Sequence, residues 1–234
     1  MKARPFVTAN FAITWDGRAS TRKLTPADFS SKRDKRRLSE IRATTDAVLV
    51  GASTVAADNM TIGISDPALR GERAKRNQLP YPVRVIVSNS GRIAPTLRVF
   101  EKDFSPIAIF STTRMAERTR TALAGKADLW LHESSEVNLA AMLATLRAEY
   151  GVRRVVCEGG PRLFRALLAA GLVDEVHLTV CPRVFGGENA PTLTGIASGF
   201  LPKSTRCTLR EMNVVDGECF LRYMILARSS RRAK

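Results

Sequence analysis

The sequence is poor in the residues that build disulfide frameworks, zinc sites and histidine-based catalytic triads. Its 234 residues include four cysteines and two histidines. No two cysteines have the C-x-x-C spacing, and Cys157 and Cys181 fall within apolar runs, which favours buried, reduced thiols over a disulfide or metal site. His132 and His177 both lie in strand-like runs. We therefore expect structural histidines and no metal.

Long apolar runs are also missing. No segment approaches the length that crosses a bilayer. The N-terminal stretch MKARPFVTANF leads into a strand-like pattern and lacks the hydrophobic region and small-residue cleavage site of a signal peptide. We therefore expect a cytoplasmic protein with no membrane partner.

Negative charge is scarce relative to positive charge. Thirty-seven Lys and Arg residues against 22 Asp and Glu residues give a net charge of +15, part of it in Lys32–Arg37 and part in Arg228–Lys234. Aromatic residues make up 6% of the chain and do not alternate with these basic runs, so the stacking surfaces of nucleic-acid-binding proteins are not expected. An anionic small-molecule substrate accounts for the charge better than nucleic acid, which stays the weaker alternative.

Strand-like and helix-like patterns alternate along most of the chain. Strands are predicted at Phe6–Thr14, Ala47–Gly51, Val83–Ser88, Ile107–Ser111, Asp128–His132, Val155–Glu158 and Val176–Cys181, followed by a hairpin of Thr205–Val214 and Glu218–Leu226. Helices are predicted at Phe29–Ala43, at Arg114–Leu123 after a Thr112/Thr113 cap, and at Leu139–Tyr150 with Asn138 as its cap. This order predicts an α/β fold: a mostly parallel twisted sheet, helices on both faces, and an antiparallel C-terminal hairpin at one edge.

The sequence shows no repeat and no break in composition. We expect a single domain over residues 1–227 and a basic, flexible tail over residues 228–234. Ser65–Pro82 is predicted to be a long polar loop, of the kind that often carries function. Asp216-Gly217 is a strong signal for the turn of the final hairpin.

Two adjacent glycines separate a buried strand from a helix. Gly159 and Gly160 follow the strand, Pro161 stands where a helix begins, and Gly171 stands where it ends. Such a turn either binds a phosphate on free backbone N–H groups or is an ordinary tight connection. It follows the sixth predicted strand, whereas the usual dinucleotide-binding fingerprint follows the first, so that fold is disfavoured.

A hydroxyl and a carboxylate follow another strand that ends in glycine. Thr54 and Asp58 are four residues apart after Gly51 and would share one face of a helical turn. The alternative is that Ser53 or Thr54 merely caps this helix.

Charged residues stand near other predicted strand ends. Arg42 occupies the last turn of the basic helix, whereas Arg33, Arg36 and Arg37 are expected on its solvated face. Glu158 lies at the carboxyl end of a strand that we expect to be central, where a carboxylate could bind polar substrate groups.

Five segments occur in the order and spacing of a known family: RPFVTANFAITWDGRAS, DAVLVGASTVAADN, PVRVIVSNSGRI, CEGGPRLFRALLAAGLVDEVHL and CPRVFGG. From about Arg4 to Leu226 the chain resembles the riboflavin-pathway pyrimidine reductases, both the stand-alone enzymes and the reductase half of the bacterial deaminase–reductase. The resemblance implies a dihydrofolate-reductase-like three-layer fold, a homodimer, and NADPH as cofactor. It also implies hydride transfer to C1′ of a phosphorylated ribosylaminopyrimidine, which gives the ribityl product.

The same resemblance implies roles for individual residues. The cofactor-binding set it implies is Ala12, Thr54, Asp58, Ser88, Gly159, Gly160, Pro161 and Arg162. The substrate-binding set it implies is Arg42, Ile62 and Glu158. Glu158 is also the candidate catalytic acid, although orienting the pyrimidine or the ribose is an equally good role for it.

One segment departs from the family pattern. Many members carry an arginine that faces the substrate phosphate where this chain has Ser65, and Arg70 or the basic helix could replace it. The altered Met60–Ser65 segment keeps open a second hypothesis, a reductase of the same fold that acts on a dihydropterin or dihydrofolate. A third hypothesis, a nucleic-acid-associated binding protein, rests on the basic helix and tail.

Overall fold

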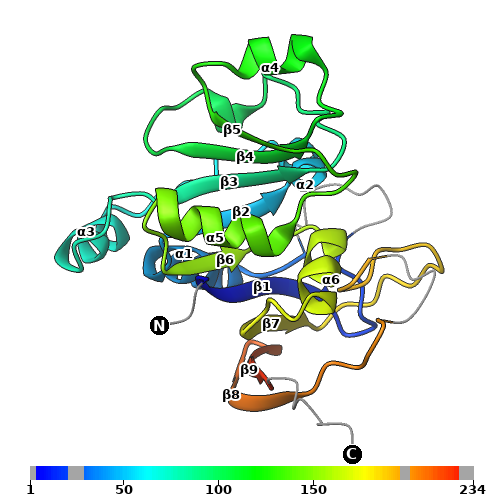
Figure 1. Cartoon of the computed structure of the whole chain (residues 1–234). Coiled ribbons are helices and arrows are strands. Elements are labelled where there is room, and N and C mark those ends of the chain that lie inside the picture. The colour runs from blue at the N-terminus through cyan, green and yellow to red at the C-terminus, as the bar shows by residue number, and fades with distance from the viewer. Residues whose placement is uncertain (1–3, 21–28, 196–200, 227–234) are drawn as a thin grey trace, which may run out of the picture.

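One mixed sheet forms the centre of the protein (Figure 1). The computed structural model describes residues 4–20, 29–195 and 201–226. In this part of the chain nine strands lie in the order β5-β4-β3-β2-β6-β1-β7-β9-β8. Their bounds are β1 (Phe6–Thr14), β2 (Ala47–Gly51), β3 (Val83–Ser88), β4 (Ile107–Thr112), β5 (Asp128–His132), β6 (Arg154–Cys157), β7 (Glu175–Cys181), β8 (Cys207–Val215) and β9 (Glu218–Ile225).

The sheet is parallel from β5 to β7 and antiparallel at the other edge. Every pairing among β1 to β7 is parallel, and β9 pairs antiparallel with both β7 and β8. Asp216 and Gly217 join β8 to β9 with φ angles of 51° and 81°, as the commonest two-residue hairpin turn requires. The predicted mostly parallel sheet with a C-terminal hairpin at its edge is confirmed.

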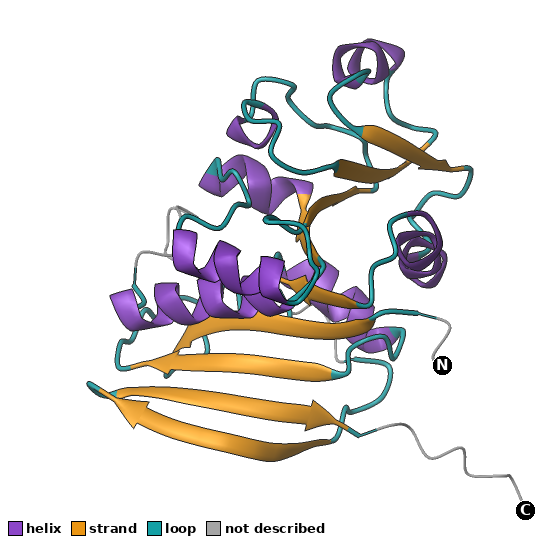
Figure 2. Cartoon of the chain, turned by 90° about the vertical axis from the view of Figure 1, so that its left-hand side faces the viewer, coloured by secondary structure: helices purple, strands orange, loops and turns teal. Residues whose placement is uncertain are grey.

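Helices cover both faces of the sheet. Their bounds are α1 (Lys32–Thr44), α2 (Ala52–Asp58), α3 (Pro67–Lys75), α4 (Glu117–Leu123), α5 (Leu139–Glu149) and α6 (Pro161–Ala169). Ala47 and Leu49 of β2 pack in one core with α5 and α6, while Val48 and Val50 pack in the other with α1, α2 and α4. Figure 2 shows helices on either side of the strands. Because alternate residues of a strand point to opposite faces, a nearly continuous apolar strand serves both cores.

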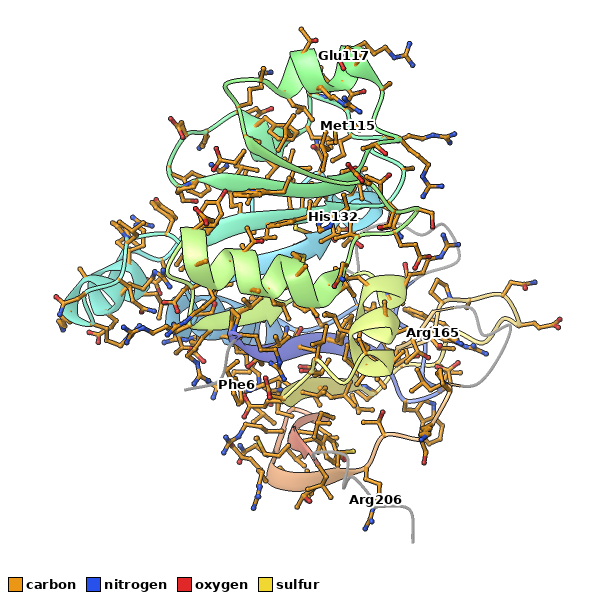
Figure 3. All side chains as sticks on the ribbon, viewed as in Figure 1. Phe6, Met115, Glu117, His132, Arg165 and Arg206 are labelled. Carbon is orange, nitrogen blue, oxygen red and sulfur yellow. The ribbon has the colours of Figure 1, made fainter. Side chains whose placement is uncertain are left out.

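The start of α4 differs from the prediction. The helix begins at Glu117 rather than Arg114, and Ala116 precedes it without a side-chain cap. Thr112 ends β4, and its hydroxyl donates to the carbonyl of Asn89, so it does not cap the helix. The turn between β4 and α4 buries Met115 (Figure 3). In α5, by contrast, Asn138 is the N-cap, as predicted.

The predicted loop Ser65–Pro82 contains a helix, so that prediction was wrong. Asp66 caps α3 by accepting from the N–H of Ala68, and Pro67 takes the first helical position. Arg73 is 1% exposed and donates to the carbonyls of Leu79, Arg42, Ala43 and Thr45. This buried guanidinium fastens α3 to the end of α1, a long-range contact that a polar sequence pattern does not reveal.

The prediction for the basic helix was partly wrong. Arg33 and Arg36 are exposed, but Arg37 packs on the sheet, where it donates to the hydroxyl of Thr179 and contacts the ring of His177. Burial lowers the pKa of Arg37. The predicted tail, residues 228–234, lies outside the described residues.

Replacement of Arg73 tests whether it fastens α3. Arg73→Met removes the guanidinium that donates to buried carbonyls at the end of α1, so we expect the free energy of unfolding to fall by about 1–3 kcal/mol. Urea denaturation measures this. Lys75→Met is the matched control, because Lys75 is on the exposed side of the same helix, and we expect it to change stability by less than about 0.5 kcal/mol. Equal effects of the two changes would contradict the role of Arg73.

Candidate functional site

The direction of the chain changes between two neighbouring strands, β2 and β6. From β2 the chain continues through α2 and α3 to β3, on one side. From β6 it continues through α6 to β7, on the other side of β1. In open α/β sheets, ligands bind outside the carboxyl ends of the strands at such a switch point. The candidate site therefore lies at the carboxyl ends of β2, β6 and the strands beside them.

The glycine pair lies at this switch point. The N–H of Gly51 donates to the carbonyl of Gly159 at 3.0 Å, which joins the ends of β2 and β6. Gly159 has a φ of 134°, a conformation that favours glycine. Gly160 precedes α6 and provides no side-chain cap, so the first N–H groups of that helix are open to a ligand. This geometry favours a phosphate-binding turn over an ordinary connection.

The side chain of Thr54 closes the other side of the turn. A Cβ atom added to Gly160 would lie 2.7 Å from the Oγ1 atom of Thr54. No side chain larger than hydrogen therefore fits at Gly160. The N-cap of α2 is Gly51, which makes no side-chain cap bond, so the alternative that Ser53 or Thr54 caps the helix was wrong.

Asp58 is an unpaired carboxylate at the end of α2. Within residues 4–20, 29–195 and 201–226, no group forms a hydrogen bond or ion pair with it. Burial raises the pKa of Asp58 above its usual value. The carboxyl end of a helix also disfavours negative charge. A carboxylate kept in such a place without a partner indicates a ligand-binding role.

Arg42 and Glu158 form a buried ion pair beside the glycine turn. Nε and Nη2 of Arg42 donate to the two carboxylate oxygens of Glu158 at 2.6 and 2.5 Å, and their side chains are 13% and 4% exposed. Burial alone lowers the pKa of Arg42, but the adjacent Glu158 carboxylate outweighs it and raises that pKa. The pair fixes the orientation of Glu158 and leaves each oxygen one lone pair for a ligand.

Residues 62 and 63 connect this pair to the loop after α2. Nη1 of Arg42 donates to the carbonyl of Gly63 at 2.7 Å. Ile62 has a φ of 58°, which is an outlier for a β-branched residue. Its side chain is 1% exposed and belongs to the core under α1 and α2. Ile62 therefore offers a ligand its strained backbone rather than its side chain.

Ala12 and Ser88 lie on β1 and β3, the strands on either side of the β2–β6 pair. The last pairing of β1 with β6 joins Ala9 to Cys157, so Ala12 lies on the part of β1 that extends past the end of β6. Ser88 ends β3, and its hydroxyl accepts from the N–H of Gly91 at 3.1 Å. Both positions thus lie at the same end of the sheet as the switch point.

The structure brings the predicted residues together along four adjacent strands. Ser88 follows β3, Thr54 and Asp58 follow β2, Glu158 and the glycine pair follow β6, and Ala12 lies in β1. Pro161 and the exposed Arg162 open α6.

Sequence reasoning missed Gly51 and Gly63 as site residues. The N–H of Gly51 donates to the glycine turn, and the carbonyl of Gly63 accepts from Arg42. The glycine that ends β2 was the available signal for Gly51, whereas nothing in the sequence marked the carbonyl of Gly63.

A surface hollow away from the switch point is lined by Asp128, Trp130 and Tyr150. There the hydroxyl of Tyr150 donates to Asp128 and accepts from the indole of Trp130. Because these polar groups already bond with one another, the hollow offers few free groups to a ligand. We therefore place the candidate site at the strand ends.

The described part of the chain has neither a membrane-spanning helix nor a cluster of metal ligands. No helix there has the length and apolar character needed to cross a bilayer. No cluster of three or more His, Cys, Asp or Glu side chains there is arranged to hold a metal ion.

One family model and two relatives of known name match most of this chain. The family model described as RibD C-terminal domain matches residues 5–219. A 2,5-diamino-6-ribosylamino-4(3H)-pyrimidinone 5′-phosphate reductase of Archaeoglobus fulgidus is 32% identical over 81% of this chain and 86% of its own length. The protein of the same name from Methanothermobacter thermautotrophicus is 34% identical over 81% and 83%.

A solved structure shares the fold. The pyrimidine reductase-like protein of Corynebacterium diphtheriae superposes with a TM-score of 0.82 at 22% identity, and the match covers 95% of this chain and 92% of that one.

Substitution of Gly160 tests the close approach of Thr54. Gly160→Ala forces its Cβ against Oγ1 of Thr54, so we expect the free energy of unfolding to fall by about 1–3 kcal/mol. Adding Thr54→Ala removes the clashing atom and should recover much of this loss. Gly71→Ala is the control: a Cβ there meets nothing within 4 Å, and we expect a gain of about 0.4–1 kcal/mol. Full stability of Gly160→Ala alone would contradict the geometry.

The unpaired carboxylate of Asp58 has a measurable effect on stability. Its folded-state pKa is raised, so the native state binds the proton more tightly and loses stability as pH rises through the range between the unfolded and folded pKa values. Asp58→Asn removes this penalty, and we expect it to stabilise the protein at neutral pH by about 0.3–1 kcal/mol. The difference should vanish in acid, where Asp58 is protonated in both states. Thermal unfolding across pH measures this, and a destabilised variant at neutral pH would show that Asp58 has a partner.

Proposed function

Because the chain belongs to the RibD C-terminal domain family, we propose that it is an NADPH-dependent reductase of riboflavin biosynthesis. Its reaction reduces the ribosyl group of a ribosylaminopyrimidine 5′-phosphate to the ribityl form. The observation that carries this proposal is the glycine turn packed against Thr54 at the switch point, with the unpaired Asp58 on the same helix. The two relatives named as pyrimidinone 5′-phosphate reductases support it.

The residues at the switch point fit a nicotinamide dinucleotide. At Gly160 a Cβ would fill the space beside Thr54, and the open N–H groups at the start of α6 suit a pyrophosphate. Pro161 and Arg162 continue this turn, and Arg162 adds a positive charge. In the proposal Ala12, Ser88, Thr54 and Asp58 hold the remainder of the cofactor, whose nicotinamide supplies a hydride when it is bound.

The Arg42–Glu158 pair suits the substrate side of the site. Glu158 is oriented by two charge-assisted bonds, and its free lone pairs can accept from the hydroxyl or amine groups of a ribosylaminopyrimidine. The strained backbone at Ile62 lies on the segment that Arg42 holds. These residues place the sugar for reaction, which is where an enzyme of this kind contributes most. Glu158 stays the candidate for proton transfer as well.

We also propose that the protein is a homodimer and that it is cytoplasmic. The edge strand β8 exposes Leu209, Met212 and Val214, apolar side chains that a homodimer would cover. The four cysteines of the chain are free thiols, as expected of a protein in a reducing cytoplasm. A dihydropterin or dihydrofolate as substrate is not favoured, because the relatives are named for a pyrimidinone phosphate.

Turnover by the purified protein tests the proposed function. We expect it to oxidise NADPH when offered 2,5-diamino-6-ribosylamino-4(3H)-pyrimidinone 5′-phosphate or its deaminated form, and to use NADH less well. Separate assays with the two substrates show which one it reduces. Glu158→Gln removes the charge that pairs with the buried Arg42, and we expect kcat/KM to fall about a hundredfold. The exposed Arg36→Gln serves as the matched control. Absence of turnover with both substrates would sink the proposal.

A further inference from the structure

A phosphorylated substrate needs a positive charge that is not already neutralised. The guanidinium of Arg42 is bound bidentately by Glu158, so the pair has little net charge to offer a phosphate. The loop after α2 carries no basic residue from Asn59 to Asp66. A second cation that reaches this segment would complete the site.

Arg70 reaches the same segment from the first turns of α3. Its Nη1 donates to the carbonyls of Ile64 and Ser65 at 2.9 and 2.8 Å. The guanidinium lies over the ring of Tyr81, 5.4 Å from the centroid, and the ring of Tyr81 in turn packs at a tilt against that of Phe104. The side chain is thus held in place on one side by the aromatic ring and on the other by the loop.

The charge of Arg70 is not neutralised. Among the residues that the structure describes, no carboxylate lies within ion-pair distance of its guanidinium, and its Nε and Nη2 atoms make no hydrogen bond. Arg73 differs, since it is buried and donates to the carbonyl of Leu79 and to carbonyls at the end of α1. Arg70 is half-buried and keeps donors free for a ligand.

Arg42 and Arg70 bind carbonyls of one short stretch. Arg42 donates to the carbonyl of Gly63, and Arg70 donates to those of Ile64 and Ser65. Two residues of chain span at most about 7 Å, so the two guanidinium groups lie along the same loop. The geometry points to Arg70 as the residue that binds the 5′-phosphate of the substrate, through the free edge of its guanidinium. This inference rests on the proposed function.

The experiment separates phosphate binding from a merely structural role. Arg70→Gln keeps an amide donor for the loop carbonyls but removes the charge. We expect its KM for the 5′-phosphate substrate to rise about tenfold or more, with the KM for the dephosphorylated riboside and kcat unchanged. Arg76→Gln is the matched control, because Arg76 also donates to a carbonyl, that of Ala43, and should leave both KM values unchanged.

Calorimetry with ribose 5-phosphate and with ribose gives a second readout that does not depend on turnover. Wild-type protein should bind the phosphate about tenfold more tightly than Arg70→Gln does, while any binding of ribose stays equal. An equal loss for phosphorylated and dephosphorylated ligands would show that Arg70 only fastens the loop and would overturn the inference, as would no change at all. If wild-type protein binds ribose 5-phosphate through Arg70 but turns over neither pyrimidine, the proposed reaction fails and the phosphate site stands.

Discussion

The ion pair between Arg42 and Glu158 joins three segments that are far apart in the sequence. Arg42 comes from the last turn of α1, Glu158 from the end of β6, and Gly63 from the loop after α2. Either charge alone would be costly to bury, so each depends on the other. Because the pair lies next to the glycine turn, it sets the positions of the loop and the strand end between which the substrate is proposed to bind.

The candidate site contains features that reduce stability locally. Asp58 has no partner in the described part of the chain, and its pKa is raised by burial. Ile62 holds a backbone conformation that costs of order 1–3 kcal/mol. Such features persist only where the surrounding packing compensates for them, and the two cores on either side of the sheet supply that packing. Their concentration beside the switch point supports a functional rather than a structural reason.

The strands and the hairpin could be predicted because their signals are local. Apolar runs bounded by glycine and polar residues marked strands such as Ala47–Gly51, and Asp216-Gly217 marked the turn. Helix α3 was missed although Asp66 and Pro67 mark its start, because its sequence is polar and its buried Arg73 binds carbonyls some thirty residues away. Arg37 was misplaced for a similar reason. A charged residue is predicted to be solvated, and only the tertiary structure shows that Arg37 packs on the sheet.

The sequence by itself determined the fold class and the glycine turn, since periodicity and turn chemistry act over a few residues, and its resemblance to a known family pointed to the other residues of the candidate site. It could not decide which of these residues touch. That Thr54 excludes any side chain at Gly160, that Arg42 pairs with Glu158, and that Arg70 lies on the loop at Ser65 were decided by the tertiary structure. The physical reason is that the first two contacts depend on the order of strands in the sheet, which brings β6 between β2 and β1, and the third depends on how α3 packs against the loop before it.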